Sequence, residues 1–302
     1  MINAQVAVQA TRFLHVNLNT ALPDASVNWY TSQLGLRVGM KTLSRIENTR
    51  GMGFDHPTEV NARFAFDHRG GRRALALEIV EWLTPPTVDY GAVDHEALGI
   101  AAIGFLAPTA HPLLQSSPRT RRLLGNDGEQ LVAATVVDPD GVHVELVADP
   151  TVEAPEFSYA RINTHDIGRS VAFYETIGFT PRGGRRNATW QSAAGPGRAV
   201  EIQALRLPGG ADFSLQLTTS SSERDAGRTA NARGLFRIAL AVDDIEAAVK
   251  AARASHIEAS DPAWVPLPDT PREGIDASFF SDPQGVMVEF VGVTEAAVER
   301  RP

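Results

Sequence analysis

The sequence contains one ten-residue pattern twice, 144 residues apart. Residues 138–147 read DPDGVHVELV and residues 282–291 read DPQGVMVEFV. In each copy an Asp-Pro-x-Gly turn leads into a segment in which apolar residues alternate with other residues, which is the period of a β-strand. The repeat predicts a tandem duplication, and in each copy it places a glutamate, Glu145 or Glu289, on the strand face opposite the apolar residues.

A second pair of segments keeps the same offset. Residues 12–18 and 156–162 are predicted strands, and each is followed by a predicted helix that reaches an aromatic pair, Trp29-Tyr30 or Phe173-Tyr174. Two independent landmarks that share one offset indicate that a long unit is repeated, and a repeat fixes the architecture before any other assignment.

Composition limits the classes of function. The 302 residues, 43% of them hydrophobic, are enough to fill two domain cores. The chain has 36 acidic and 28 basic residues, and its net charge of −8 argues against a nucleic-acid or anionic-membrane partner and favours a small molecule. The absence of cysteine excludes disulfides, thiolate metal sites and a cysteine nucleophile.

The sequence contains no targeting signal that we can identify. No uninterrupted apolar run approaches the roughly 20 residues of a membrane-spanning helix, and residues 1–10 lack the charged start and apolar centre of a signal peptide. We therefore expect a cytoplasmic protein without a membrane partner. A homodimer is compatible with these features.

Four similar units follow one another along the chain, each predicted as a strand, a helix and three further strands. In the first unit the helix is expected over residues 23–33, with Gly35 as its stop. The helix of the second unit, near residues 111–116, is short and poor. The four units cover residues 11–84, 97–150, 156–219 and 233–293, which groups them into an N-terminal domain (1–150) and a C-terminal domain (151–302).

The order of these motifs resembles the vicinal oxygen chelate superfamily, which includes glyoxalase I, bleomycin-resistance proteins and extradiol dioxygenases. The resemblance rests on His15-Val16-x-Leu18, Trp29-Tyr30 and Leu34-Gly35-Leu36, followed by Asp-Pro-Asp-Gly-x-x-x-Glu-Leu. It implies an α+β fold of four βαβββ modules in two tandem glyoxalase-like domains, whose curved mixed β-sheets surround a divalent metal or a ligand.

The resemblance also implies where ligands come from, namely the first and last strand of each module. The implied N-terminal positions are His15, Glu78, Ala102 and Glu145, and the C-terminal ones are Tyr159, Gln216, Arg237 and Glu289. Only the first set still looks like a metal site, with His15, Glu78 and Glu145 as ligands and Glu78 or Glu145 as a catalytic base. One imidazole with carboxylates suits Zn, Ni, Fe or Mn.

The residues themselves leave alternatives open. His15 shares a predicted strand face with Phe13 and Asn17, and it is either a ligand or a hydrogen-bonded interior histidine. Glu78 is a lone acid in an apolar strand, where solvent exposure competes with ligation. Ala102 ligates nothing. His143, two residues before Glu145, is an alternative ligand that would give the set His15, His143 and Glu145, but it is favoured as a polar group that faces the substrate.

The C-terminal half is predicted to hold no metal. Arg237 is expected to pair with Glu289 in a buried bridge, and its charge opposes a cation. Module pairing stays open. If modules pair within each half, His15 and Glu145 share one cup, whereas pairing of module one with module four joins His15 and Glu78 to Arg237 and Glu289.

Three functions follow from the resemblance. The first is a metal-dependent enzyme, lyase- or isomerase-like, whose metal acts as a Lewis acid on two neighbouring substrate oxygens. The second is a metal-free protein that binds a small molecule or drug, like bleomycin-resistance proteins. The third is an extradiol-type dioxygenase, which is disfavoured because Tyr159, Arg237 and Glu289 replace the expected ligands in the second half.

Overall fold

All four expected modules are present in the computed structural model, which describes residues 10–91, 94–115, 121–126, 128–192, 195–209, 213–222 and 228–294. The first module contains β1 (Arg12–Asn19), α1 (Pro23–Leu34), β2 (Arg37–Ile46), the 3-10 turn η1 (Arg50–Met52), β3 (Thr58–Phe66) and β4 (Ala76–Thr84). The second contains β5 (Gly99–Ala107), α2 (Pro112–Gln115), β6 (Arg122–Gly125), β7 (Gln130–Val132), β8 (Ala134–Val137) and β9 (His143–Ala148). The third contains β10 (Glu156–Thr164), α3 (Ile167–Thr176), β11 (Thr180–Pro181), β12 (Arg186–Ser192), β13 (Gly195–Arg206) and β14 (Ser214–Thr219). The fourth contains β15 (Gly234–Val242), α4 (Ile245–Ala254), β16 (Ala263–Leu267), β17 (Glu273–Ser281) and β18 (Met287–Gly292).

The helices begin and end close to where the sequence predicts. Gly35 ends α1 in the left-handed conformation, with a φ of 68°, which costs a glycine little because it has no Cβ. The expected poor helix of the second module is the four-residue α2, and Ser116 at its predicted end lies outside the described residues. None of the described helices is long and apolar enough to cross a membrane.

The modules pair across the two halves of the sequence. One sheet has the strand order β16-β17-β18-β15-β1-β4-β3-β2, so it combines modules one and four. The other has the order β7-β6-β12-β13-β14-β10-β5-β9-β8 and combines modules two and three. We call them the 1–4 cup and the 2–3 cup. The division near Pro150 therefore separates the two copies in sequence, but neither copy builds a cup by itself.

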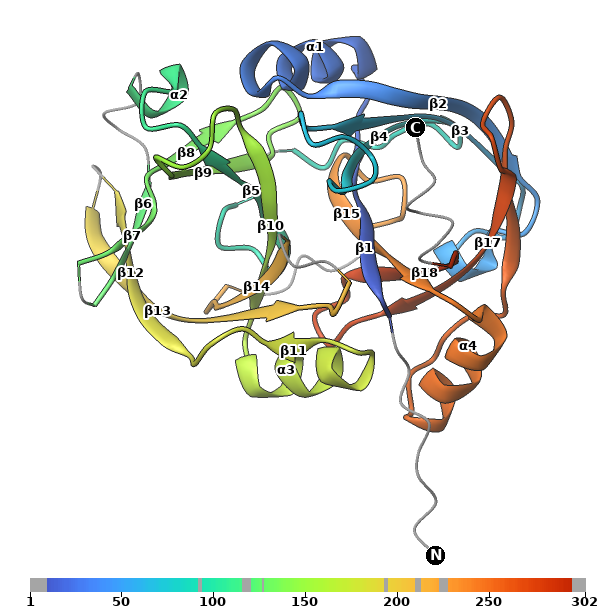
Figure 1. Ribbon diagram of the computed structural model, residues 1–302. Helices are drawn as coiled ribbons and strands as arrows, with labels where there is room; N and C mark the ends of the chain where they lie inside the picture. The colour runs from blue at the N-terminus through green and yellow to red at the C-terminus, as the bar shows by residue number, and fades with distance from the viewer. Residues whose placement is uncertain are drawn as a thin grey trace, which may run out of the picture.

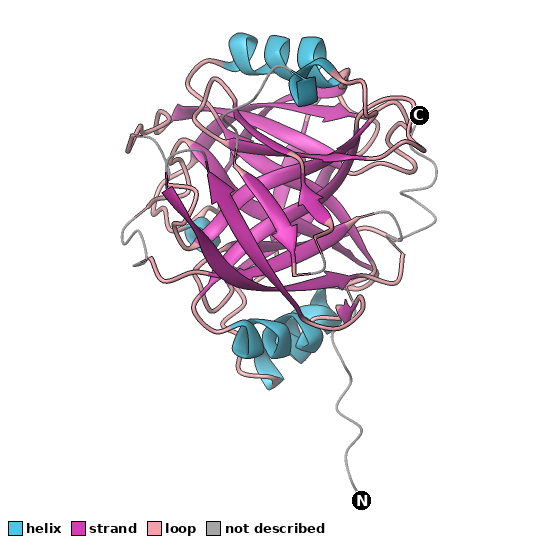
Figure 2. Ribbon diagram, turned by 90° about the vertical axis from the view of Figure 1, so that its left-hand side faces the viewer, coloured by secondary structure: helices cyan, strands magenta, loops and turns pink. Residues whose placement is uncertain are grey.

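Both sheets curve until their edges approach each other, and the two cups lie side by side (Figure 1). In the 1–4 cup the hydroxyl of Thr42 on β2 donates to the carbonyl of Pro268, which follows β16, at 3.0 Å. The helices lie at two opposite ends of the molecule, with the strands between them (Figure 2). The cup interiors are therefore enclosed mainly by strands.

One apolar core joins the backs of the two cups. It contains residues of all four modules, among them Val16, Leu77, Phe105, Phe157 and Phe290, each less than 2% exposed. Because side chains alternate along a strand, this packing directs the intervening residues of the same strands into the cup interiors.

A β-bulge at the start of β1 changes which side chains face the cup. The pairing of β1 with β15 is irregular between Phe13 and His15, so two consecutive residues there do not alternate simply. Phe13, expected on the same strand face as His15, lies in the core, and its neighbour Leu14 lines the cup. His15 still faces the cup as predicted.

The aspartate of each Asp-Pro-x-Gly turn ties the two cups together. Asp138 accepts hydrogen bonds from the backbone N–H groups two and four residues later and, at 2.8 Å, from the hydroxyl of Tyr30 on α1. Asp282 repeats all three contacts, with Tyr174 on α3 as the hydroxyl donor at 2.8 Å. In each case helix and turn belong to different cups, so the repeated motif serves structure.

Replacement of Tyr30 or Tyr174 by Phe will lower the free energy of unfolding by about 1.5–3 kcal/mol, since each change removes a buried hydrogen bond to a carboxylate. Urea unfolding measures the change. Tyr90→Phe is the matched control, because the Tyr90 side chain is exposed and its hydroxyl only approaches Thr229 at 3.4 Å. If the buried variants lose no more stability than this control, the two turns do not join the cups.

Candidate functional site

Four side chains converge at the floor of the 1–4 cup: His15 of β1, Glu78 of β4, Arg237 of β15 and Glu289 of β18. Nε2 of His15 lies 3.2 Å from Oε2 of Glu78 and 3.4 Å from Oε2 of Glu289. The guanidinium of Arg237 contacts the same two oxygens, with Nη2 at 2.7 Å from Glu78 and Nε at 2.9 Å from Glu289. The pair of Arg237 and Glu289 that the sequence predicts is therefore present, and Glu78 shares it.

Both Arg237 and Glu289 are held in their charged forms. Burial lowers the pKa of Arg237, but Glu289 and Glu78 raise it more, so its pKa is above the ordinary value. Burial raises the pKa of Glu289, but Arg237 and His15 outweigh this effect and leave it lowered. The floor therefore places one fixed positive charge between two buried carboxylates.

Several polar atoms of this floor lack a hydrogen bond. Among the described residues, Nε2 of His15, Nε of Arg237 and Oε2 of Glu289 are buried and contact one another as ion pairs, but none of the three makes a hydrogen bond of regular geometry. Asn17 donates to Glu78 at 3.2 Å, but its own oxygen is also unpartnered. Buried polar atoms without partners are costly and rare, so this group points to a function.

A cavity of about 490 Å³ opens above these atoms. Its walls are mainly apolar and include Leu14, Met40, Phe64, Phe66, Ile275 and Val291. An apolar chamber with a few convergent polar groups is the usual form of a site for a small molecule.

The floor does not provide a ready place for a metal ion. The part of the chain described here contains no group of three or more His, Asp or Glu side chains that could hold one. At this floor the two carboxylate oxygens that face His15 are already bound to Arg237. A divalent ion among them would lie close to the guanidinium, and Coulomb repulsion opposes that placement.

The structure places Glu145 in the other cup, which corrects the expectation that it shares a cavity with His15. It is fully buried against Arg161, which contacts both carboxylate oxygens, with Nε at 2.9 Å from each. The Tyr159 hydroxyl donates to the same carboxylate at 2.8 Å, and Nε2 of His95 lies 3.3 Å away. Burial raises the pKa of Glu145, but Arg161 and His95 lower it by a larger amount, so the resulting pKa is about 2.

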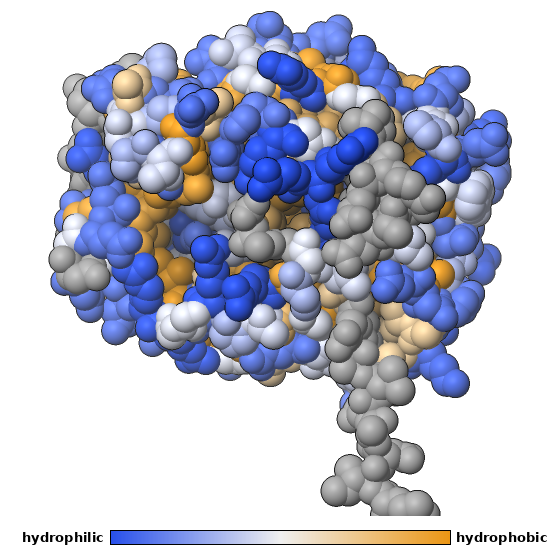
Figure 3. Space-filling view, viewed as in Figure 1, coloured by the Kyte–Doolittle hydropathy of each residue, from blue (hydrophilic) through white to orange (hydrophobic). Residues whose placement is uncertain are grey.

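The 2–3 cup is filled by its own side chains at this level. The Tyr159 ring occupies the space beside Gly104, where an added Cβ would lie 2.0 Å from the ring. The His95 ring packs edge-on against Trp190, with ring centroids 4.4 Å apart. In Figure 3 the opening of this cup appears as a hollow bordered by hydrophobic side chains, in a face that is otherwise mostly hydrophilic.

Three other residues that the sequence analysis considered for the site, Ala102, His143 and Gln216, also lie in the 2–3 cup and therefore apart from His15. Ala102 is completely buried and pairs in register with His143 on β9. The His143 ring packs against the His95 ring, with 5.0 Å between their centroids. His143 therefore lies near Glu145 in the 2–3 cup, and its strand belongs to a different sheet from the floor of the 1–4 cup. Gln216 lies on β14, in register with Arg161.

An asparagine clamp positions the linker at each cup. Asn19 donates to the carbonyls of Ala230 and Ala232 at 2.7 and 2.8 Å. Asn163 donates to the carbonyls of His95 and Ala97 at 2.8 and 3.0 Å. The clamped linker thus presents a small alanine to one cup and an imidazole to the other. Sequence reasoning missed both clamps, although the two asparagines keep the 144-residue offset.

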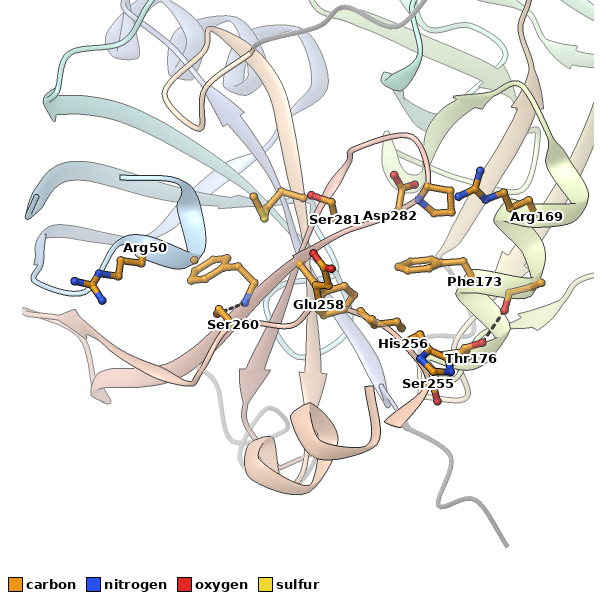
Figure 4. A pocket seen from close by; sticks show the side chains of 17 residues that line it. Arg50, Arg169, Phe173, Thr176, Ser255, His256, Glu258, Ser260, Ser281 and Asp282 are labelled. Atoms are coloured by element: carbon orange, nitrogen blue, oxygen red, sulfur yellow. Dashed lines mark hydrogen bonds between the residues drawn. The ribbon is translucent and has the colours of Figure 1, made fainter. Parts of the chain in front are cut away.

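A second hollow lies between α3 and the segment after α4 (Figure 4). Its volume of about 670 Å³ exceeds that of the cup cavity. However, two of its polar side chains are bonded to nearby backbone: Thr176 donates to the Ala172 carbonyl, and Ser260 accepts from the Phe279 N–H. None of the buried unpartnered atoms of the described residues lies there. The cup cavity is therefore the better candidate site.

Comparisons with known proteins agree with this architecture. Residues 156–290 match the model of the Glyoxalase/Bleomycin resistance protein/Dioxygenase superfamily. The structure is similar to glyoxalase I from Zea mays, with a TM-score of 0.62 and 17% identity over 95% of this chain and 94% of that one. It is also similar to a candidate dioxygenase of Bacillus subtilis subsp. subtilis str. 168, with a TM-score of 0.59 and 16% identity over 97% and 91% of the two chains. No protein of curated function matches the sequence.

The pKa of Glu145 predicts part of the acid sensitivity of the fold. Because this pKa falls from 4.5 to about 2 on folding, the ionised carboxylate stabilises the protein above pH 4.5 by about 3 kcal/mol, and this stabilisation is lost as the pH falls towards 2. Urea unfolding between pH 5 and 3 will therefore show a steeper loss of stability for the wild type than for Glu145→Gln.

At pH 7 the same variant will be less stable by about 3–5 kcal/mol, because it leaves Arg161 buried without its carboxylate. Glu47→Gln, which changes an exposed pair with Arg45, is the control. An unchanged pH dependence in Glu145→Gln would show that the Glu145 pair does not set this part of the acid response.

Proposed function

Since the chain has the fold of the vicinal oxygen chelate superfamily and its residues 156–290 belong to the glyoxalase, bleomycin-resistance and dioxygenase group, we propose that the protein binds a small organic molecule in the 1–4 cup without a metal. The observation that carries this proposal is the set of buried polar atoms that lack a regular hydrogen bond beneath an apolar cavity. Arg237 takes the place of a cation there.

The floor is suited to a ligand with two neighbouring oxygen atoms. One ligand oxygen accepts a hydrogen bond from Nε of Arg237, and a neighbouring hydroxyl donates to Oε2 of Glu289. His15 then exchanges a hydrogen bond with either oxygen through Nε2. These contacts give regular hydrogen bonds to atoms that have only ion-pair contacts within the protein. The polar groups of the ligand are therefore recognised at the floor, and the walls bury its apolar body.

The metal-dependent enzyme predicted from the sequence is the second candidate. One observation favours it: Nε2 of His15 lies within 3.4 Å of both carboxylate oxygens, so three donor atoms converge. A lyase or isomerase with Zn, Ni, Fe or Mn requires Arg237 to leave these oxygens first. A ring-cleaving dioxygenase is supported only by fold similarity, and the floor offers one histidine rather than two.

The neutral probe N-phenyl-1-naphthylamine, added in buffer with EDTA, tests the preferred candidate. It will bind saturably to the wild type, because its rings fit the apolar walls and its N–H can donate to the floor. Ile275→Trp, which extends a cavity wall, will weaken binding at least roughly tenfold, since the indole fills the space that the probe needs.

Val137→Trp is the control, because Val137 is exposed on β8 of the other cup. Circular dichroism melting verifies that both variants fold. Probe binding that is unaffected by Ile275→Trp, or that appears only when Zn or Ni is supplied, would refute metal-free binding in this cup.

A further inference from the structure

Two arginines with no ion-pair partner among the described residues line the same cavity. Arg37 begins β2, and Arg272 lies in the turn between β16 and β17. These strands form the two edges of the 1–4 sheet, which approach each other at Thr42 and Pro268. The two guanidiniums therefore reach the cavity from opposite edges of one sheet.

The acidic groups that line the cavity do not pair with these arginines. The one other acid that lines the cavity apart from Glu78 and Glu289 is Asp67, within the described residues. Its buried carboxylate accepts from Arg69 at 2.7 Å and from the backbone N–H of Phe157 at 2.9 Å. Asp67 is therefore occupied by other donors.

The position of Arg37 and Arg272 differs from that of Arg237. Arg37 is exposed and Arg272 is half-buried, whereas the floor carboxylates are almost fully buried. The cavity thus runs from a paired, buried floor past apolar walls to a positively charged mouth. This mouth is unusual on a chain whose net charge is −8, because the protein as a whole repels anions.

We infer that the ligand of the 1–4 cup is an amphipathic organic anion, with an apolar body inside the cavity and a carboxylate, sulfonate or similar group held at the mouth by Arg37 and Arg272. This inference rests on the proposed function and adds the ligand's charge to it. Guanidinium groups bind such oxyanions through charge-assisted hydrogen bonds that can be bidentate.

Two probes that differ only by a sulfonate group separate binding of an anion from ligand binding in general. 1-Anilinonaphthalene-8-sulfonate is N-phenyl-1-naphthylamine with an added sulfonate. The wild type will bind the sulfonate probe roughly tenfold more tightly than the neutral one, because the sulfonate gains charge-assisted contacts at the mouth. Added salt will weaken binding of the sulfonate probe and leave that of the neutral probe nearly unchanged, since salt screens exposed charges.

The double variant Arg37→Gln, Arg272→Gln will lose this preference. Its affinity for the sulfonate probe will fall roughly tenfold, and its affinity for the neutral probe will stay within about twofold. Arg45→Gln on the same strand is the matched control, because Arg45 is exposed, pairs with Glu47 and does not line the cavity.

The outcomes distinguish a failure of the anionic ligand class from a failure of ligand binding in the 1–4 cup. If Ile275→Trp blocks both probes but the double arginine variant leaves the preference intact, or weakens both probes equally, the anionic ligand class is wrong and the cup site stands. If neither probe binds, or Ile275→Trp affects neither, the proposed function fails and the ligand class fails with it.

Discussion

The antiparallel pairing of β1 with β15 determines which side chains share a cup. It joins residues more than 200 positions apart in sequence, and the parallel partners β4 and β18 follow on either side. Through this pairing the first strands and last strands of modules one and four place His15, Glu78, Arg237 and Glu289 at one floor. Without it, Glu78 and Glu289 would each face a different neighbour, and neither copy of the repeat would build a site.

The two cups show how one repeated unit can give an open site and a filled one. Each floor holds a guanidinium against a buried glutamate, Arg237 with Glu289 and Arg161 with Glu145. In the 2–3 cup the hydroxyl of Tyr159 and the linker imidazole of His95 complete the hydrogen bonding of the glutamate. In the 1–4 cup the linker offers only Ala230 at the clamp, and Nε2 of His15 and Oε2 of Glu289 are left without a hydrogen bond of regular geometry.

The sequence predicted the fold well because its repeat carries local signals. The Asp-Pro-x-Gly turns, the Gly35 stop and the alternation in β9 depend on neighbouring residues, so they can be read without knowing the pairing. The site was predicted in part: His15, Glu78 and the pair of Arg237 with Glu289 lie where their strand phases placed them. Glu145 could not be assigned to a cup from the sequence. The alternation of apolar residues shows which strand face a side chain lies on, but it does not show which other strand pairs with that strand. Nothing local marked His95, which reaches its cup only through a linker held by Asn163.

Arg237 occupies the place of a cation between two carboxylates, and we propose that it leaves the cup free of metal. Titration with Co²⁺, followed by its visible absorption, tests this claim when the wild type is compared with Arg237→His. The variant removes the opposing charge and adds an imidazole beside His15, Glu78 and Glu289, a donor set that suits Zn²⁺ and Co²⁺. We expect no stoichiometric Co²⁺ band for the wild type and one bound ion per chain for the variant. A wild type that binds one Co²⁺ per chain as tightly as the variant would contradict it.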